Sequence, residues 1–67
     1  MISIEMNGNR REIEDDSTIA QLLAQSEISS RFCAVELNLE IVPKDEYSSR
    51  RLVSGDKLEV VTLVGGG

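Results

Sequence analysis

The first eight residues restrict the fold of this chain more than any other segment. Apolar residues alternate with polar ones at Ile2, Ile4 and Met6, a period of two that is typical of a strand with one buried face. The dipeptide Asn7-Gly8 follows directly, and it favours a type I′ turn because both central residues of that turn have positive φ. Residues 1–13 are therefore predicted to form a β-hairpin.

A short helix is predicted after the hairpin. Thr18-x-x-Gln21 fits a capping box, in which the threonine hydroxyl accepts a hydrogen bond from a backbone N–H and the glutamine reaches back to the cap. Asp15 and Asp16 come just before it, where negative charge favours a helix N-terminus. The apolar stripe that should face the core consists of Ile19, Leu22 and Leu23. The helix is expected to end near residue 25 or 26.

The rest of the chain predicts further strands and turns. They are a strand over Ala34 to Leu39, a short apolar run at Ile41 and Val42, a turn or single helical turn over Pro43 to Tyr47, a turn at Ser54-Gly55-Asp56, and a last strand over Lys57 to Val64. Together with the hairpin, whose second strand should begin near Arg10, this order predicts the α+β class, with a mixed sheet and one main helix packed on one face. Residues 1–64 are expected to form the domain, and residues 65–67 a flexible C-terminal glycine tail.

Composition argues against several classes of function. A single domain of 67 residues buries only about 60% of its unfolded surface, which leaves no room for a deep catalytic pocket. A net charge of −5 disfavours nucleic-acid binding, which needs a basic footprint. One cysteine, Cys33, and no histidine leave no internal disulfide and no cysteine pair for zinc. Because no signal peptide and no apolar run of transmembrane length is present, we expect a cytoplasmic protein without membrane contact.

The C-terminal residues Gly65-Gly66-Gly67 are the main candidate for function. Three glycines have the most permissive backbone available, and fully extended they reach roughly 10 Å. A carboxylate on such a tether can enter a narrow active site of another protein, where it can be activated as an acyl adenylate and converted by a sulfur nucleophile into a thiocarboxylate. Terminal glycines alone are also consistent with a frayed end, but their position directly after a strand favours the functional interpretation.

The last strand offers a second candidate site. Leu58, Val60, Thr62 and Val64 share one face, and Glu59, Val61 and Leu63 share the other. If the first face covers the core, Val61 and Leu63 form a possible docking patch near the tail. They are equally consistent with ordinary exposed apolar residues.

The remaining reactive or charged residues favour structural roles. Cys33 lies between Phe32 and Ala34 without a histidine base, so it is expected to be a small, partly buried hydrophobe rather than a nucleophile. The acidic residues Glu12, Glu14, Asp15 and Asp16 and the pair Arg50-Arg51 are best explained as solvated charge. No catalytic residue, no metal site and no cofactor site is expected in this chain.

Over nearly its whole length the chain resembles the ThiS family, the bacterial thiamine-biosynthesis sulfur carriers of the ubiquitin-like β-grasp superfamily. The segments that carry the resemblance are Ile2 to Gly8, Ser17-Thr18-Ile19-Ala20-Gln21-Leu22-Leu23, Ala34-Val35-Glu36-Leu37-Asn38, Glu40-Ile41-Val42-Pro43-Lys44, Gly55-Asp56-Lys57-Leu58-Glu59-Val60-Val61 and the glycine end. The sequence departs from the family at Leu39, where glycine is frequent, and at Tyr47, where tryptophan is common. It also has the extra Gly65 before the usual terminal pair.

The resemblance implies a carrier and not an enzyme. Gly67 would be the covalent position, adenylated by a ThiF-like adenylyltransferase of the ubiquitin-activating type and converted to a thiocarboxylate by a persulfide protein. ATP and Mg²⁺ would be bound by that partner, not by this chain. A ThiG-like thiazole synthase would accept the sulfur. Gly65 and Gly66 would fit the partner's narrow channel, with Val61 and Leu63 as possible docking contacts.

Three alternatives remain open at this point. The nearest is the small subunit of molybdopterin synthase, another β-grasp sulfur carrier with a Gly-Gly end. The second is a ubiquitin-like modifier that is joined to lysines of other proteins. The third is a β-grasp interaction module whose glycines are inert.

Overall fold

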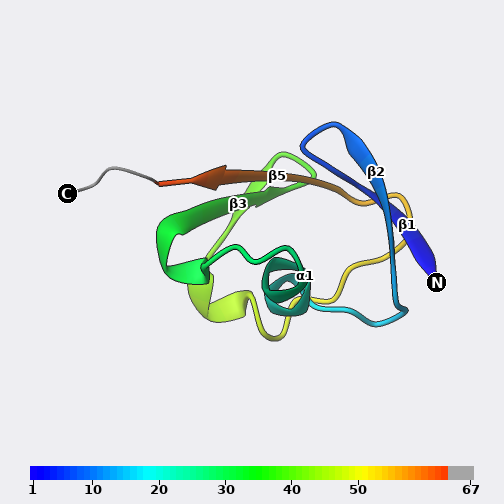
Figure 1. Cartoon of the computed structure of the whole chain (residues 1–67), viewed down its shortest axis with the longest axis horizontal. Helices are drawn as coiled ribbons and strands as arrows, with labels where there is room; N and C mark the ends of the chain where they lie inside the picture. The colour runs from blue at the N-terminus through cyan, green and yellow to red at the C-terminus, as the bar shows by residue number, and fades with distance from the viewer. Residues whose placement is uncertain (64–67) are drawn as a thin grey trace.

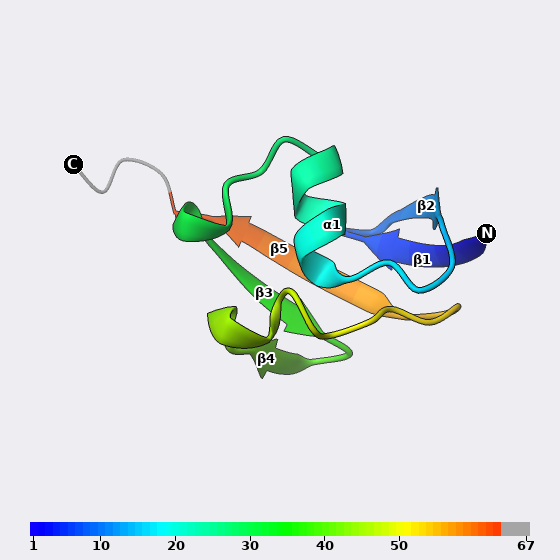
Figure 2. The same ribbon diagram turned by 90° about the horizontal axis from the view of Figure 1, so that it is seen from below.

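A five-stranded sheet with one helix across one of its faces makes up the part of the chain that the computed structural model describes, residues 1–63 (Figures 1 and 2). The elements are β1 (Ile2–Met6), β2 (Asn9–Ile13), α1 (Ile19–Gln25), the 3₁₀ turn η1 (Ser30–Phe32), β3 (Cys33–Leu37), β4 (Glu40–Val42), the 3₁₀ turn η2 (Lys44–Glu46) and β5 (Lys57–Thr62). The strand order is β2-β1-β5-β3-β4. Because β5 runs parallel to β1 and antiparallel to β3, the predicted α+β class and mixed sheet are confirmed.

The predicted N-terminal hairpin is confirmed. Strands β1 and β2 pair antiparallel from Ile2 opposite Ile13 to Met6 opposite Asn9, so the second strand begins one residue earlier than expected. The backbone φ is 51° at Asn7 and 83° at Gly8, which is the double positive φ that a type I′ turn requires.

The capping box at the start of α1 is also confirmed. The Gln21 N–H donates to Thr18 Oγ1 at 3.1 Å, and the Thr18 N–H donates to Gln21 Oε1 at 2.8 Å. The next free amides of the first turn bond to the segment after η2: the Ile19 N–H donates to the Arg50 carbonyl and the Ala20 N–H to the Tyr47 carbonyl. These bonds satisfy donors that a helix cannot satisfy itself and fix residues 47–50 against α1.

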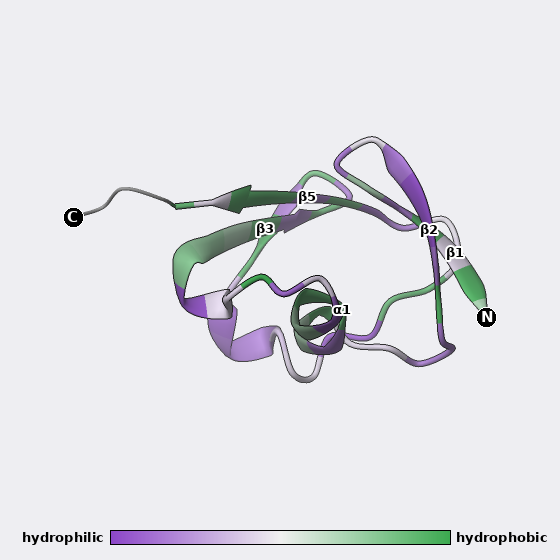
Figure 3. Cartoon of the chain, viewed as in Figure 1, coloured by the Kyte–Doolittle hydropathy of each residue, from purple (hydrophilic) through white to green (hydrophobic). Residues whose placement is uncertain are grey.

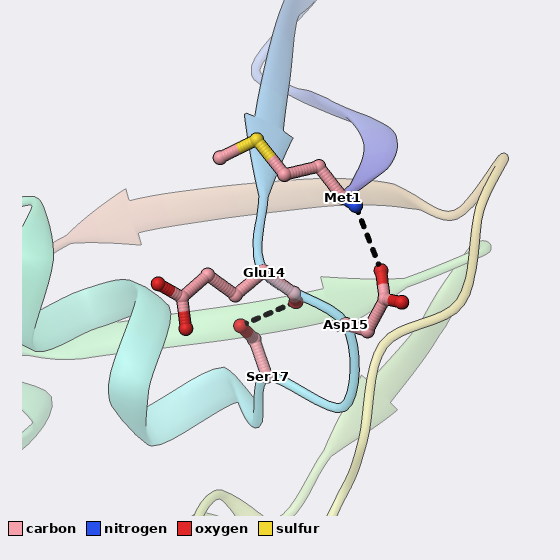
Figure 4. A network of polar contacts seen from close by, with 4 residues as sticks. All are labelled: Met1, Glu14, Asp15 and Ser17. Carbon is pink, nitrogen blue, oxygen red and sulfur yellow. Dashed lines mark hydrogen bonds and ion pairs between the residues drawn. The ribbon is translucent and has the colours of Figure 1, made fainter.

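The two aspartates before α1 do not act on the helix as predicted. The Asp15 carboxylate forms an ion pair with the Met1 ammonium group at 3.2 Å (Figure 4), and Asp16 occupies a turn with φ 64°. The first turn of α1 holds no acidic residue. The Ser17 hydroxyl donates to the Glu14 carbonyl at 2.7 Å and stabilises this turn, so the segment connects β2 to α1 and does not complement the helix dipole.

The boundary of the third strand differs from the prediction. The strand extends over Cys33–Leu37, and Asn38 and Leu39 form the turn to β4 with φ 51° and 72°. Leucine gave no turn signal because residues with a Cβ rarely adopt positive φ. A two-residue turn at this point gives a second hairpin, in which Leu37 pairs with Glu40.

Two asparagine side chains add to the backbone pairing of β5, which has five register pairs with β3. The backbone of β1 pairs with β5 at only two positions, Glu5 with Lys57 and Met6 with Leu58. Beyond them the Asn7 amide continues the ladder, donating to the Val60 carbonyl at 3.1 Å and accepting from the Val60 N–H at 2.7 Å. On the other side Asn38 Oδ1 accepts from the Lys57 N–H at 3.0 Å.

The core lies between the sheet and α1. It consists of Ile4, Met6, Ile13, Ile19, Leu22, Leu23, Cys33, Val35, Leu37, Val42, Tyr47, Leu52, Leu58 and Val60. This set includes the predicted apolar stripe of α1 and the predicted inner residues Leu58 and Val60 of β5. Edge strand β2 is largely hydrophilic, whereas the arrowhead end of β5 is strongly hydrophobic (Figure 3). Within residues 1–63 no helix is long and apolar enough to cross a membrane.

Replacing Leu39 by glycine is expected to stabilise the protein. The side chain is 91% exposed and the backbone φ is 72°, so Leu39→Gly relieves the left-handed strain and loses little burial. After the entropy cost of glycine, the gain is about 0.5–1 kcal/mol, measured from urea unfolding. Leu39→Ala is the control, since it keeps the Cβ. Equal stability of the two variants would contradict the strain at this turn.

The variant Asn7→Gly tests the two hydrogen bonds between the Asn7 side chain and the Val60 backbone. Glycine keeps the positive φ but removes both hydrogen bonds to Val60, so the unfolding free energy should fall by roughly 1–3 kcal/mol. Asn9→Ala, in the same hairpin and exposed, should change it by less than about 0.5 kcal/mol. A similar small change in both variants would show that the Asn7 amide does not hold β5.

Candidate functional site

The candidate site begins where β5 ends. The predicted carrier residues Gly65, Gly66 and Gly67 lie outside the described residues, as does the expected domain boundary after residue 64, so both stay predictions. Residues 1–63 show how the chain reaches them. The pairing of β5 with β3 extends to Thr62 opposite Cys33, and beyond it the Leu63 N–H donates to the Phe32 carbonyl at 2.6 Å.

Four apolar residues gather at this end of the sheet, and we call them the strand-end patch: Phe32, Ala34, Val61 and Leu63. Val61 is 57% exposed and Leu63 54% exposed, as expected if the opposite face of β5 covers the core. Ala34 stands opposite Val61 in the register, and Phe32, 57% exposed, is hydrogen-bonded to Leu63. Whether this patch docks a partner stays a prediction.

Sequence reasoning missed Phe32 and Ala34 as members of this patch. Both lie on the segment that pairs with the end of β5, and a single sequence does not give the register between strands about 30 residues apart. The only available signal was that Ala34 begins the predicted strand and Phe32 precedes it by two residues.

Two cations hold η1 beside the patch. The Arg31 guanidinium carbon lies 5.7 Å from the centre of the Phe32 ring, within the range of a cation–π contact. The Lys44 ammonium group donates to the Arg31 carbonyl at 2.9 Å. The bond from Lys44 connects η1, whose Phe32 carbonyl accepts from the Leu63 N–H, to η2.

A pair of carboxylates lies farther along the same two strands. Glu36 of β3 is directly opposite Glu59 of β5, and both are exposed. We call them the carboxylate pair. Ile41 of β4 stands opposite Glu36 on the other side and is also exposed. Like charges directly opposite one another destabilise a sheet, so this arrangement is unfavourable for the fold.

Cys33 is fully buried, more so than the partial burial that the sequence predicted. Its side chain belongs to the core, and burial raises the pKa of its thiol, an effect that the nearby Lys44 ammonium partly offsets. A raised pKa leaves less thiolate at neutral pH, and the thiolate is the reactive form. The residue is therefore a packing residue.

The acidic cluster seen in the sequence is dispersed in the structure. Glu12 lies 3.7 Å from Arg10, and Asp15 pairs with the Met1 ammonium group. Arg50 pairs with Glu46 at 3.6 Å. No three metal-ligating side chains come together among residues 1–63.

Comparison with known proteins finds one family model and several relatives that are similar to this chain. A family model described as the ThiS family matches residues 4–67. The sulfur carrier protein ThiS of Bacillus subtilis is 39% identical over 54 residues, which cover 81% of this chain and 82% of that protein. A thiazole synthase of Paramagnetospirillum magneticum is 42% identical over 66 residues, which cover 98% of this chain and 20% of that protein. The chain thus spans one fifth of the length of that relative.

Similarity to a solved structure confirms the fold. A crystal structure of the thiamine biosynthesis protein ThiS from Geobacter metallireducens matches 98% of this chain and 100% of its own, with a TM-score of 0.83 and 22% identity. The described residues therefore have the predicted ubiquitin-like β-grasp fold.

The buried thiol predicts a loss of stability at alkaline pH. Below the ordinary thiol pKa the native and unfolded states are both protonated. Above it the unfolded chain loses a proton that native Cys33 retains, so the unfolding free energy falls as pH rises. Urea unfolding between about pH 8 and 10 should show this fall, and Cys33→Ala should make it shallower. Identical slopes in both proteins would contradict the raised pKa.

Proposed function

The chain belongs to the ThiS family, and we propose that it is a sulfur carrier of thiamine biosynthesis whose working group is the carboxylate of Gly67. The observation that carries this proposal is the family match over residues 4–67, which includes the glycine end. The 39% identity to the sulfur carrier ThiS of Bacillus subtilis supports the same role. It also favours thiamine biosynthesis over the molybdopterin-synthase alternative.

The proposed chemistry needs no catalytic side chain in this protein. The Gly67 carboxylate attacks the α-phosphorus of ATP, pyrophosphate leaves, and an acyl adenylate forms. A persulfide sulfur then attacks the acyl carbon and displaces AMP. A second thiol breaks the sulfur–sulfur bond and leaves the thiocarboxylate. ATP and Mg²⁺ belong to the adenylating enzyme, which is of the ubiquitin-activating type.

The short connection from the sheet to Gly67 constrains that enzyme. Four residues follow Leu63, and fully extended they span at most about 14 Å. The reacting carboxylate therefore stays within that distance of the end of the sheet. Gly65, Gly66 and Gly67 have no Cβ, so a channel only slightly wider than a polypeptide backbone can admit them.

A thiazole synthase is the proposed acceptor of the sulfur. The thiazole synthase of Paramagnetospirillum magneticum contains a segment 42% identical to this chain, which supports a functional connection between the two activities. In this proposal the strand-end patch, with Val61 and Leu63, lies against the partners while the glycines occupy their channels.

Gly66→Ala tests the role of the glycine end. The added methyl group should clash with the walls of the channel, so the rate of adenylation, measured by ATP–pyrophosphate exchange, should fall about 100-fold. Urea unfolding should be unchanged because residue 66 follows the sheet.

Ser54→Ala provides the matched control. Ser54 is exposed in the turn that precedes β5, at the opposite end of that strand from the glycines. The adenylation rate of the Ser54→Ala variant should therefore equal that of the unaltered chain. If Gly66→Ala is also adenylated at the normal rate, the glycines are inert and the interaction-module alternative gains support.

A further inference from the structure

The short connection to Gly67 determines which surface an adenylating enzyme must touch. The enzyme has to approach within about 14 Å of Leu63, at the end of the sheet. Helix α1 covers one face of that sheet (Figure 2). The face turned away from α1 is exposed at Glu5, Arg10, Glu12, Ala34, Glu36, Ile41, Lys57, Glu59 and Val61, and we call it the open face.

An interface of ordinary size on this face extends to the carboxylate pair. A standard interface buries about 800 Å² on each partner, which corresponds to a roughly circular area of about 16 Å radius. Glu59 precedes Leu63 by four residues, about 14 Å along an antiparallel strand. An interface centred on the strand-end patch therefore includes Glu36 and Glu59.

No ion pair among residues 1–63 neutralises this pair. Neither Glu36 nor Glu59 forms a side-chain hydrogen bond with another residue in that range. Lys57 lies two residues before Glu59 on the same exposed face of β5, but it forms no ion pair with Glu59 or Glu36, and Arg10 of the open face lies with Glu12 and with the Ser3 hydroxyl. Two adjacent carboxylates without an ion-pair partner form a site for a planar group with several N–H donors, and the arginine guanidinium is that group.

Resting on the proposed function, we propose that the adenylating enzyme places an arginine against the carboxylate pair while apolar residues around its channel cover the strand-end patch. A second copy of this chain does not fit this face, because it would bring the same two carboxylates and a net charge of −5 against them. The pair thus selects a basic partner and aligns the glycine end with its channel.

If the carboxylate pair serves docking, changing it should weaken binding to the enzyme without lowering the stability of the fold. Because Glu36 and Glu59 are like charges directly opposite each other, neutralising them should not lower the stability of the sheet and should slightly raise it. The same change removes the acceptors for the arginine. A residue that acts only through the fold would lower stability and docking together.

The experiment compares two double variants that change the net charge equally. Glu36→Gln/Glu59→Gln neutralises the pair, and Glu14→Gln/Asp45→Asn neutralises two exposed carboxylates in segments on the α1 side of the sheet (Figure 1). In ATP–pyrophosphate exchange with the adenylating enzyme of the same source, the KM for the first variant should rise about 10-fold at low salt, with kcat unchanged. The control should stay within about 2-fold.

Thermal unfolding completes the test. The midpoint of Glu36→Gln/Glu59→Gln should equal or exceed that of the unaltered chain. Glu36→Lys, which places a cation opposite Glu59, should raise both the midpoint and the KM further.

The outcomes are distinguishable. Equal KM changes in the two double variants would reduce the effect to net charge and overturn the arginine contact, while leaving the sulfur-carrier proposal intact. An unaltered chain that the enzyme does not adenylate would overturn both proposals. Self-association of the unaltered chain that Glu36→Gln/Glu59→Gln strengthens would assign the open face to a second copy.

Discussion

The central position of β5 between two hairpins is the constraint on which the rest of the structure depends, and two asparagine side chains at the tips of those hairpins reinforce it. Strand β5 has five backbone pairs with β3 but only two with β1. The Asn7 amide adds two hydrogen bonds at Val60. On the opposite side Asn38 bonds to the Lys57 N–H and to the Asp56 carboxylate. Both residues have φ 51°, so each combines the turn conformation with a contact to β5.

The proposed carrier role is compatible with what this placement leaves exposed. Because β5 is paired on both sides, the chain leaves the sheet at a defined point, the end of this central strand. Helix α1 covers one face of the sheet and leaves the other face open. The described residues offer a packed core, a buried thiol and no cluster of metal ligands. In the proposed function such a domain contributes position and recognition, and the reactions at Gly67 would depend on the groups of the enzymes that bind it.

Local sequence signals predicted most of the fold. Asn7-Gly8 gave the hairpin, Thr18 and Gln21 gave the start of the helix, and the alternation around Val60 gave the buried face of β5. Each of these signals is contained within a few residues. The turn at Leu39 was missed because leucine is an unusual residue at positive φ, and Asp15 was misassigned because its partner is the distant Met1 ammonium group. The carboxylate pair and the strand-end patch depend on the register between β3 and β5, which the sequence alone does not specify.

Intact mass of the protein purified from cells of its own source tests the central claim most directly. Fragmentation would assign any added mass to a residue. The account predicts a population heavier by the difference between one sulfur and one oxygen atom, with the change at Gly67. If only the unmodified mass is found, even after incubation with ATP, a persulfide donor and the adenylating enzyme, the protein is not a thiocarboxylate carrier.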